Sequence, residues 1–547
     1  MIIIAHRSCY RINTADDVYL SLTFLLARSH VSREAVHRLA YYCSPVIFLI
    51  LIMVCSSMIS VVQPVLGSSP ISLPKYIDEY QIPTLNSAPL AITIDRNGMV
   101  WFTESNVSKI AEFDPTSKTF HEYSVPGVGD MWGIVTDPKG YVWVTQYSGK
   151  GAVNPGGAII QGGSGQILRF NMTTKNFTSI LIPTNGSFPL RLALDQQGRV
   201  WFTELLTTKI GVYDPRSNRL REYPVPTNSS GPADLAFDAN GMLWFSESYA
   251  RQVGRFDPQS ESFTEYRVGA DTASQIVSSP VGIAIDDAHN LWLADHGGNW
   301  IAQFNPTTGM TVKYPTRFPP RDVYPISLVN DLLIDSEGRV WFCEHGGNSI
   351  GYYEPSDKKM VEYRIPSGPI STVLWLALAS NGDVWFSEWS SNKIGVVHQN
   401  LPVPTSLKIS DNHYNMNAGE KKTLSFIVAS TEVAGNCTLR YSWSSYNPRE
   451  ASIEFTPAYP PLNTETQVQV QVAVINRINP GNYTLALQAD LGDVTVSIML
   501  EIVITQTQTS TQPIMIQAII LVSLIILIIA VIEFRRIRRP ARVESKP

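Results

Sequence analysis

Residues 89–114, PLAITIDRNGMVWFTESNVSKIAEFD, contain three short runs of β-branched and aromatic residues, with a turn at Asp95–Gly98 between the first two. The tryptophan of this stretch has six counterparts in a similar setting, at intervals of 42 to 58 residues. The seven are Trp101, Trp143, Trp201, Trp244, Trp292, Trp341 and Trp385. Repeats of about this length, with four short strands each, are typical of β-propeller blades.

Each repeat follows the same order of signals. An Asp-x-x-Gly-type turn usually precedes the tryptophan strand, and a Lys-Ile-Gly-like triplet, an Asp-Pro-type turn and a Glu-Tyr-x-x-Pro-like strand follow it. Proline presets the backbone for such bends. Four strands cannot bury both faces of their own sheet, so the blades must stack on one another. We therefore expect the tryptophans to fill the core between blades.

The ring is predicted to close by pairing its two ends. The seventh repeat starts near Val373 and has three strands, the last near Lys393–Val397. The missing fourth strand matches IDEYQIP at Ile77–Pro83. Pairing these segments would remove an exposed sheet edge. The sequence thus predicts a seven-bladed β-propeller over residues 75–400.

The tryptophan repeat stops after the propeller. Residues 401–505 contain alternating runs such as TQVQVQVAVI and VTVSIMLEIVI, separated by turn signals. This pattern predicts an immunoglobulin-like β-sandwich, which we interpret as a stalk. The predicted fold class is all-β: a seven-bladed propeller plus this sandwich, with a C-terminal transmembrane helix.

The two ends of the chain predict export and anchoring. Residues 1–67 contain an apolar run at 46–62, interpreted as a signal segment cleaved near Gly67 or kept as an uncleaved anchor. A polar linker at 506–513 precedes an apolar run at 514–533, long enough for a membrane helix, and a basic tail at 534–547. The positive-inside rule places that tail in the cytoplasm. We expect a single-pass cell-membrane protein with both domains outside.

The net charge and the cysteine spacing limit the kinds of partner that we expect. The formal net charge is −5, which gives no indication of nucleic-acid binding. The five cysteines show no metal-ligand spacing. Cys343 stands where other repeats have Thr or Ser, and we expect a buried free thiol there.

One face of the propeller is predicted to carry the site. The long connections at 147–166, 269–280 and 316–330 open on the same face as the loops that follow the tryptophan strands. Carboxylates three positions after the tryptophans end those strands, and such groups from several blades can hold Mg²⁺ or Ca²⁺. The predicted metal ligands are Glu344, Glu388, Glu247 and Asp295. In the alternative interpretation these acids only cap strand ends.

Two histidines directly follow two of these acids. His296 and His345 occupy the matched strings ADHGGN and CEHGGN. They are candidates for a catalytic acid or base. The alternative is that they are loop residues beside Gly-Gly turns.

The repeat GxVWFTE…NKIGxxDP…ITEYxxP resembles the streptogramin lyase family, seven-bladed propellers, over roughly Ile77 to Val397. The resemblance implies ester cleavage by elimination, with Mg²⁺, glutamates and histidines. A base would remove a Cα proton while the metal stabilises the enolate. The family's histidines stand in a Pro-His-Gly-Ile setting near the start of inner strands. The matching positions are Leu90, Trp132, Leu190, Ala233, Val281, Asn330 and Leu374.

Because none of these positions is histidine, two functions compete. The first is a ligand-binding or sensing module for an extracellular small molecule, peptide, glycan or envelope protein. The second is a metal-dependent carbon–oxygen lyase acting on an ester or lactone. The missing histidines favour binding, and the retained acids keep the lyase as the alternative.

Overall fold

The structure is a computed structural model. It describes residues 73–148, 163–269, 277–317, 326–399, 401–403, 405–430, 435–445, 448–506 and 512–537. The predicted N-terminal region 1–67, with its signal segment at 46–62, lies outside these residues. So do residues 507–511 of the predicted linker and 538–547 of the predicted basic tail.

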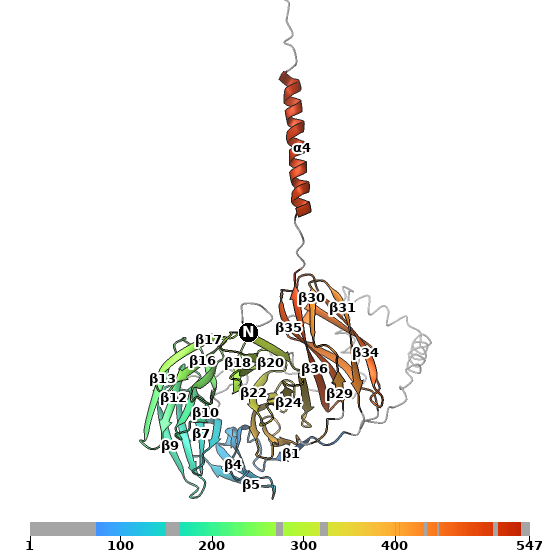
Figure 1. The fold of residues 1–547 in the computed structure, drawn as a ribbon. Helices are drawn as coiled ribbons and strands as arrows, with labels where there is room; N and C mark the ends of the chain where they lie inside the picture. The colour runs from blue at the N-terminus through green and yellow to red at the C-terminus, as the bar shows by residue number, and fades with distance from the viewer. Residues whose placement is uncertain are drawn as a thin grey trace, which may run out of the picture. The chain divides into compact units, whose positions relative to one another are not determined.

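Within these ranges the first part of the chain forms seven antiparallel four-strand units, the blades of a propeller (Figure 1). Blade 1 consists of β2 (Pro89–Ile94), β3 (Val100–Glu104), β4 (Lys109–Asp114) and β5 (Thr119–Ser124). Blade 2 consists of β6 (Asp130–Thr136), β7 (Tyr141–Ser148), β8 (Ser164–Asn171) and β9 (Phe177–Asn185). Blade 3 consists of β10 (Pro189–Leu194), β11 (Val200–Glu204), β12 (Lys209–Asp214) and β13 (Arg219–Pro224).

The remaining blades repeat this order. Blade 4 consists of β14 (Pro232–Phe237), β15 (Leu243–Glu247), β16 (Gln252–Asp257) and β17 (Ser262–Arg267). Blade 5 consists of β18 (Pro280–Ile285), β19 (Leu291–Asp295), β20 (Trp300–Phe304) and β21 (Thr311–Pro315). Blade 6 consists of β22 (Val329–Ile334), β23 (Val340–Glu344), β24 (Ser349–Glu354) and β25 (Lys359–Arg364). Blade 7 consists of β26 (Val373–Leu378), β27 (Val384–Glu388), β28 (Lys393–Val397) and β1 (Ile77–Gln81).

The first strands of the blades form a closed ring. Each inner strand contacts the inner strands of the two neighbouring blades, in the order β2, β6, β10, β14, β18, β22, β26 and back to β2. The loops between blades and the loops after the tryptophan strands open on one side of this ring, which we call the interblade-loop face. The Asp-x-x-Gly and Asp-Pro turns open on the opposite side.

The ring closes as the sequence predicts. β1 pairs antiparallel with β28, with Ile77 opposite Val397 and Gln81 opposite Lys393. The Lys393 ammonium also contacts the Glu79 carboxylate at 3.2 Å. The start of the propeller thus supplies the outer strand of its last blade.

The Asp-x-x-Gly repeat has a structural cause. In blade 1, Asp95 Oδ1 accepts hydrogen bonds from the amides of Asn97 and Met99, while Oδ2 accepts one from the indole of Trp101 at 3.3 Å. Gly98 has φ +82°, a conformation that suits glycine. The same Asp–Trp bond recurs in blades 2 to 6 at 2.8–3.0 Å. One carboxylate therefore both builds the turn and satisfies a buried indole.

Other repeated residues join the strands and blades together. A Cβ on Gly211, in the Lys-Ile-Gly triplet, would come within 2.0 Å of the Phe202 ring, so a larger residue there would require that ring to move. The Thr203 hydroxyl accepts from the amide of Arg191 and donates to the carbonyl of Ala233 in the next blade. Cys343 takes the place of that hydroxyl in blade 6 and is a buried free thiol, as expected.

Two further sheets follow the propeller. One contains β29 (Ser406–Lys408), β31 (Lys421–Ala429), β34 (Thr466–Val474) and β33 (Ala451–Thr456). The other contains β32 (Thr438–Trp443), β35 (Gly481–Asp490), β36 (Val494–Thr505) and β30 (His413–Asn417). Side chains of both sheets share one hydrophobic cluster, as in a β-sandwich. The finer immunoglobulin-like assignment stays a prediction.

The sandwich continues the sheet of blade 6. β36 pairs antiparallel with the outer strand β25, from Lys359 opposite Ile498 to Tyr363 opposite Val494. Pairing covers a strand edge that would otherwise be open. No pattern in the sequence predicted this junction.

The predicted transmembrane segment, 514–533, falls within the helix α4 (Gln512–Ile537). Over the part of the chain that the structure describes, no helix is long and apolar enough to cross a membrane. The membrane-spanning helix is thus not borne out and stays a prediction.

Candidate functional site

A pocket of about 560 Å³ opens at the centre of the interblade-loop face. It is lined by one residue near the start of every inner strand. These residues are Leu90, Trp132, Leu190, Ala233, Val281, Asn330 and Leu374. They are the positions at which the resemblance led us to look for histidines. The family motif therefore points to the pocket, although the residue type has changed.

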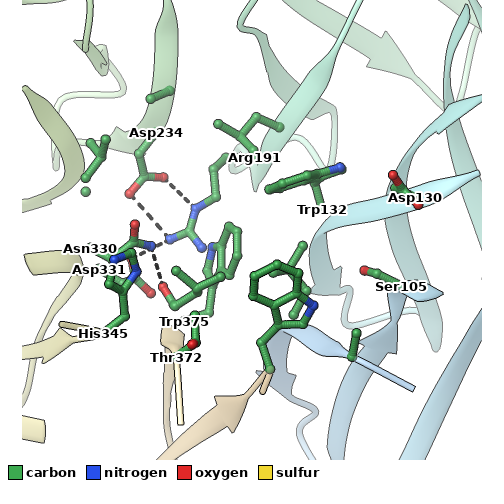
Figure 2. A pocket seen from close by; sticks show the side chains of 18 of the residues that line it. Ser105, Asp130, Trp132, Arg191, Asp234, Asn330, Asp331, His345, Thr372 and Trp375 are labelled. Atoms are coloured by element: carbon green, nitrogen blue, oxygen red, sulfur yellow. Dashed lines mark hydrogen bonds and ion pairs between the residues drawn. The ribbon is translucent and has the colours of Figure 1, made fainter. Parts of the chain in front are cut away.

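Aromatic side chains form much of the pocket wall (Figure 2). Trp132, Trp375 and Trp389 all line it, and the rings of Trp132 and Trp375 meet edge to face at 6.5 Å. Trp389, in the loop after β27, is 43% exposed. Leu85, Val128 and Tyr249 are also exposed and lie in loops of the same face. Large exposed apolar groups gathered on one face indicate a binding surface.

A buried ion cluster forms the floor. Arg191 Nε lies 2.8 Å from Asp234 Oδ1, and its Nη2 lies 2.8 Å from Asp331 Oδ1 (Figure 2). Both aspartates also accept backbone hydrogen bonds: Asp234 from Ile283 at 3.1 Å and Asp331 from Leu376 at 2.9 Å. The cluster thereby connects the inner strands of blades 3 to 7. We interpret the cluster as a structural feature that joins these inner strands.

Burial and charge act against each other on Arg191 and Asp331. Burial lowers the pKa of Arg191, but Asp234 and Asp331 raise it more, so the net shift is upward. Burial raises the pKa of Asp331 to about 6, although Arg191 pulls it down. The guanidinium also lies over the Trp375 ring, 5.4 Å from its centroid. At neutral pH Asp331 is therefore mostly ionised, and the guanidinium of Arg191 keeps its charge.

The structure brings the two predicted histidines together. His296 and His345 come from neighbouring blades, both line the pocket, and their rings meet edge to face at 4.9 Å. Burial lowers the pKa of both, and that of His345, which His296 lowers further, falls to about 3. His296 Nδ1 is buried without a hydrogen-bond partner among the described residues. Two neutral imidazoles thus border the cavity.

The structure does not bring the predicted metal ligands together. Glu344, Glu388, Glu247 and Asp295 are fully buried at their strand ends, and none lines the pocket. Three of them accept hydrogen bonds within their own blades: Glu344 from Ser349 at 2.7 Å, Asp295 from Trp300 Nε1 at 2.7 Å and Glu247 from Gln252 at 3.2 Å. In the described ranges no three His, Cys, Asp or Glu side chains are placed to hold a metal ion. The Mg²⁺ or Ca²⁺ site stays a prediction.

The glutamates at these strand ends form carboxyl pairs that the sequence reasoning missed. In five blades the buried glutamate after the tryptophan interacts with a second glutamate from the outer strand. The pairs are Glu104 with Glu122, Glu204 with Glu222, Glu247 with Glu265, Glu344 with Glu362 and Glu388 with Glu79. Burial first, and the second carboxylate in addition, raise the pKa of Glu104 and of Glu388 to about 8. The recurring glutamate of the Glu-Tyr-x-x-Pro strand was the sequence signal for these pairs.

The floor cluster was also missed. Arg191, Asp234 and Asp331 share one position of the repeat, the residue after the family's histidine position. Other blades have Ala91, Gly133, Gly282 or Trp375 there, so charged residues stood out at a position facing the channel. That contrast between repeats was the available signal.

Known proteins resemble the propeller part of the chain. The virginiamycin B lyase family profile matches residues 75–372, more than half of the chain. A solved streptogramin B lyase is 25% identical, with a TM-score of 0.50 over 59% of this chain and 97% of that one. Virginiamycin B lyase from Staphylococcus aureus is 22% identical, with a TM-score of 0.49 over 59% of this chain and 99% of that one. No curated protein matches. The chain belongs to the virginiamycin B lyase family.

Proposed function

We propose that this member of the virginiamycin B lyase family is a binding or sensing module that takes an amphipathic small molecule into its central pocket. The pocket itself carries the proposal. Its volume, about 560 Å³, falls within the range of ligand pockets, roughly 300–1,000 Å³. Such pockets combine apolar walls with a few placed polar groups. Here the tryptophans supply the walls, and the floor cluster and the histidines supply the polar groups.

Binding is favoured over catalysis by what the polar groups already do. The carboxylates of Asp234 and Asp331 are held by Arg191 and by backbone amides, so neither is placed as a base. The positions of the family's histidines carry no imidazole. A pocket built from side chains fixed in the ring suits recognition of a ligand.

The proposed location is the outer face of a cell membrane. The apolar run 514–533 and the arginines after it support an anchor at the C-terminus. The apolar run at 46–62 supports export. In this arrangement the ligand comes from outside the cell, as a small molecule or as part of a peptide, glycan or envelope protein.

Binding can be tested with the full chain and 2-phenylethanol, a neutral amphipathic probe. Tryptophan fluorescence should change in a saturable way on titration, because three indoles line the cavity. The variant Trp389→Ala should weaken binding. Tyr459→Ala, which removes an exposed aromatic side chain from the sandwich, should not. An unsaturable or absent change in the wild type would refute the proposal.

A lyase is the second candidate, and the histidine pair favours it. His296 and His345 are neutral, adjacent and line the pocket, so they can accept a proton, although the pKa of about 3 makes His345 a weak base. The test is incubation with a streptogramin B depsipeptide and Mg²⁺, followed by chromatography and mass spectrometry. Elimination opens the ring without a change of mass, whereas hydrolysis adds one water. We expect no turnover. Ring opening by the wild type that His345→Ala abolishes would establish the lyase instead.

A further inference from the structure

We propose that the pocket selects a neutral aromatic carboxamide, held off the ring axis against blades 5, 6, 7 and 1. This inference rests on the proposed function, since it names the chemical class of the ligand for the same pocket. It follows from one position of the repeat, the fourth residue after the blade tryptophan. In the order of the blades this position holds Ser105, Tyr147, Leu205, Ser248, His296, His345 and Trp389.

The side chains at this position show that the pocket lies to one side of the ring axis. Those that line the cavity come from blades 5, 6, 7 and 1, which follow one another around the closed ring. They are His296, His345, Trp389 and Ser105. In blades 2 to 4 the side chain at this position is buried and does not line the cavity. A ligand therefore meets two imidazoles, an indole and a hydroxyl along one side of the ring.

The charges of the pocket are already paired, which favours a neutral ligand. Arg191 contacts Asp234 and Asp331 at 2.8 Å, and backbone amides donate to both carboxylates. The third carboxylate of the lining, that of Asp130, also has an interaction within the protein. Burial lowers the pKa of both histidines, so they add no charge at neutral pH. An ion in this cavity would lose its hydration without gaining an unpaired counter-charge.

The histidine pair fits a group that both donates and accepts hydrogen bonds. A neutral imidazole has one N–H donor and one nitrogen acceptor. The rings of His296 and His345 meet edge to face at 4.9 Å, so their donors and acceptors lie close together. Nδ1 of His296 has no hydrogen-bond partner among the described residues, which leaves this ring with capacity for a ligand. A carboxamide carries a donor and an acceptor side by side and stays uncharged.

The indole of Trp389 provides a surface for the aromatic group of the ligand. It belongs to the blade next to that of His345, lines the pocket and is exposed. Val128, from the connection between blades 1 and 2, is also exposed and lines the same cavity. A flat ring that covers these side chains removes apolar surface from water, which stabilises the complex. The ligand then reaches from the histidines to the indole.

Three probes with one skeleton test the preference for a neutral ligand. 3-Phenylpropanamide, 3-phenylpropanoate and 3-phenylpropylammonium differ in the charge of the end group and little in size. Equilibrium dialysis with the full chain at neutral pH should show the amide binding about tenfold tighter than either ion. An ion that binds as tightly as the amide, or more tightly, would overturn the inference. This comparison uses the wild type alone, so it does not depend on the folding of any variant.

Variants at the repeat position locate the ligand. His296→Leu, which gives blade 5 the residue type of blade 3, should weaken binding of 3-phenylpropanamide about threefold to tenfold, as expected for one net hydrogen bond. It should not weaken binding of ethylbenzene, which has no polar group. Trp389→Ser, which gives blade 7 the residue type of blade 1, should weaken both. Ser248→Ala is the matched control at the same position of blade 4, outside the pocket, and should change neither.

The outcomes separate this inference from the proposed function. Circular dichroism verifies that each variant folds. A loss of amide binding in Ser248→Ala as large as in His296→Leu would place the ligand elsewhere and overturn the inference. Saturable binding of 2-phenylethanol without a preference for the amide would overturn the inference and leave the proposed function standing. Failure of every probe to bind, 2-phenylethanol included, would overturn both.

Discussion

Replacing the buried Glu104 by glutamine should remove part of the pH dependence of stability. The Glu104 side chain is fully buried, and neither carboxylate oxygen has a hydrogen-bond partner within the described residues. Its neighbour Glu122 is held as a carboxylate by Lys109 at 2.7 Å. Glu104 therefore carries the proton of the pair, because burial and the nearby charge raise its pKa to about 8.

The sign and size of the effect follow from the linkage between proton binding and folding. In the unfolded chain a glutamate titrates near 4.3, so between about pH 5.5 and 7.5 only the folded state binds this proton. Proton binding to the folded state means that stability falls as pH rises through this window. One proton corresponds to about 1.4 kcal/mol per pH unit. Glutamine keeps the shape but cannot titrate, so the wild-type and variant curves should diverge by about 2.7 kcal/mol over two units.

The measurement is the free energy of unfolding from denaturant titrations at three pH values in this window. The stability of Glu104→Gln relative to the wild type should rise steadily with pH. Glu454→Gln, on an exposed position of β33, serves as the control and should follow the wild type. Parallel curves for Glu104→Gln and the wild type would show that the buried carboxyl is ionised in the folded protein, and the reasoning would fail.

Further predictions concern the ring. Arg191→Met should lower the free energy of unfolding by about 3–5 kcal/mol, because it leaves Asp234 and Asp331 buried without their cation. Replacing both aspartates by asparagine in the same variant should recover part of this loss. Trp244→Phe should lower the free energy of unfolding by about 1–3 kcal/mol more than Trp385→Phe. The Trp244 indole donates a hydrogen bond to Asp238, whereas blade 7 has Ala379 at that position. Equal losses would refute a role for this hydrogen bond. Gly211→Ala should cost about 1–3 kcal/mol by collision with Phe202. Deleting residues 68–84 should lower the melting temperature sharply by removing β1, and an unchanged value would contradict closure through this strand.

Much of the propeller could be predicted because its strongest signals are local. The Asp–Trp bond joins residues six positions apart, so the turn, the strand and the buried indole recur together in the sequence. The ring closure, although it joins the two ends of the domain, was also predictable, since a missing strand in one repeat left an unmatched copy elsewhere. The junction with the sandwich could not be predicted. β36 follows no repeat, and its pairing with β25 depends on two domains meeting.

The site was harder to predict because its residues belong to no motif. The acids after the tryptophans recur, and recurrence suggested a shared metal site. In the structure each of these acids is buried at the end of the second strand of its own blade, and the metal site stays a prediction. A residue type that recurs from blade to blade is explained by the structure of the single blade. The central pocket occurs once and is formed by all seven blades together.

The pocket therefore depends on the positions where the repeats differ. Arg191 and Asp331 are 140 residues apart and meet only because β10 and β22 face the same axis. Neither residue is unusual alone, and each becomes informative when it is compared with the alanine or glycine at the same position of other blades. The propeller offers seven such inner positions to one cavity, so a change in any blade alters the pocket without altering the fold. The proposed binding function would need only changes of this kind, a different set of inner residues on the same ring.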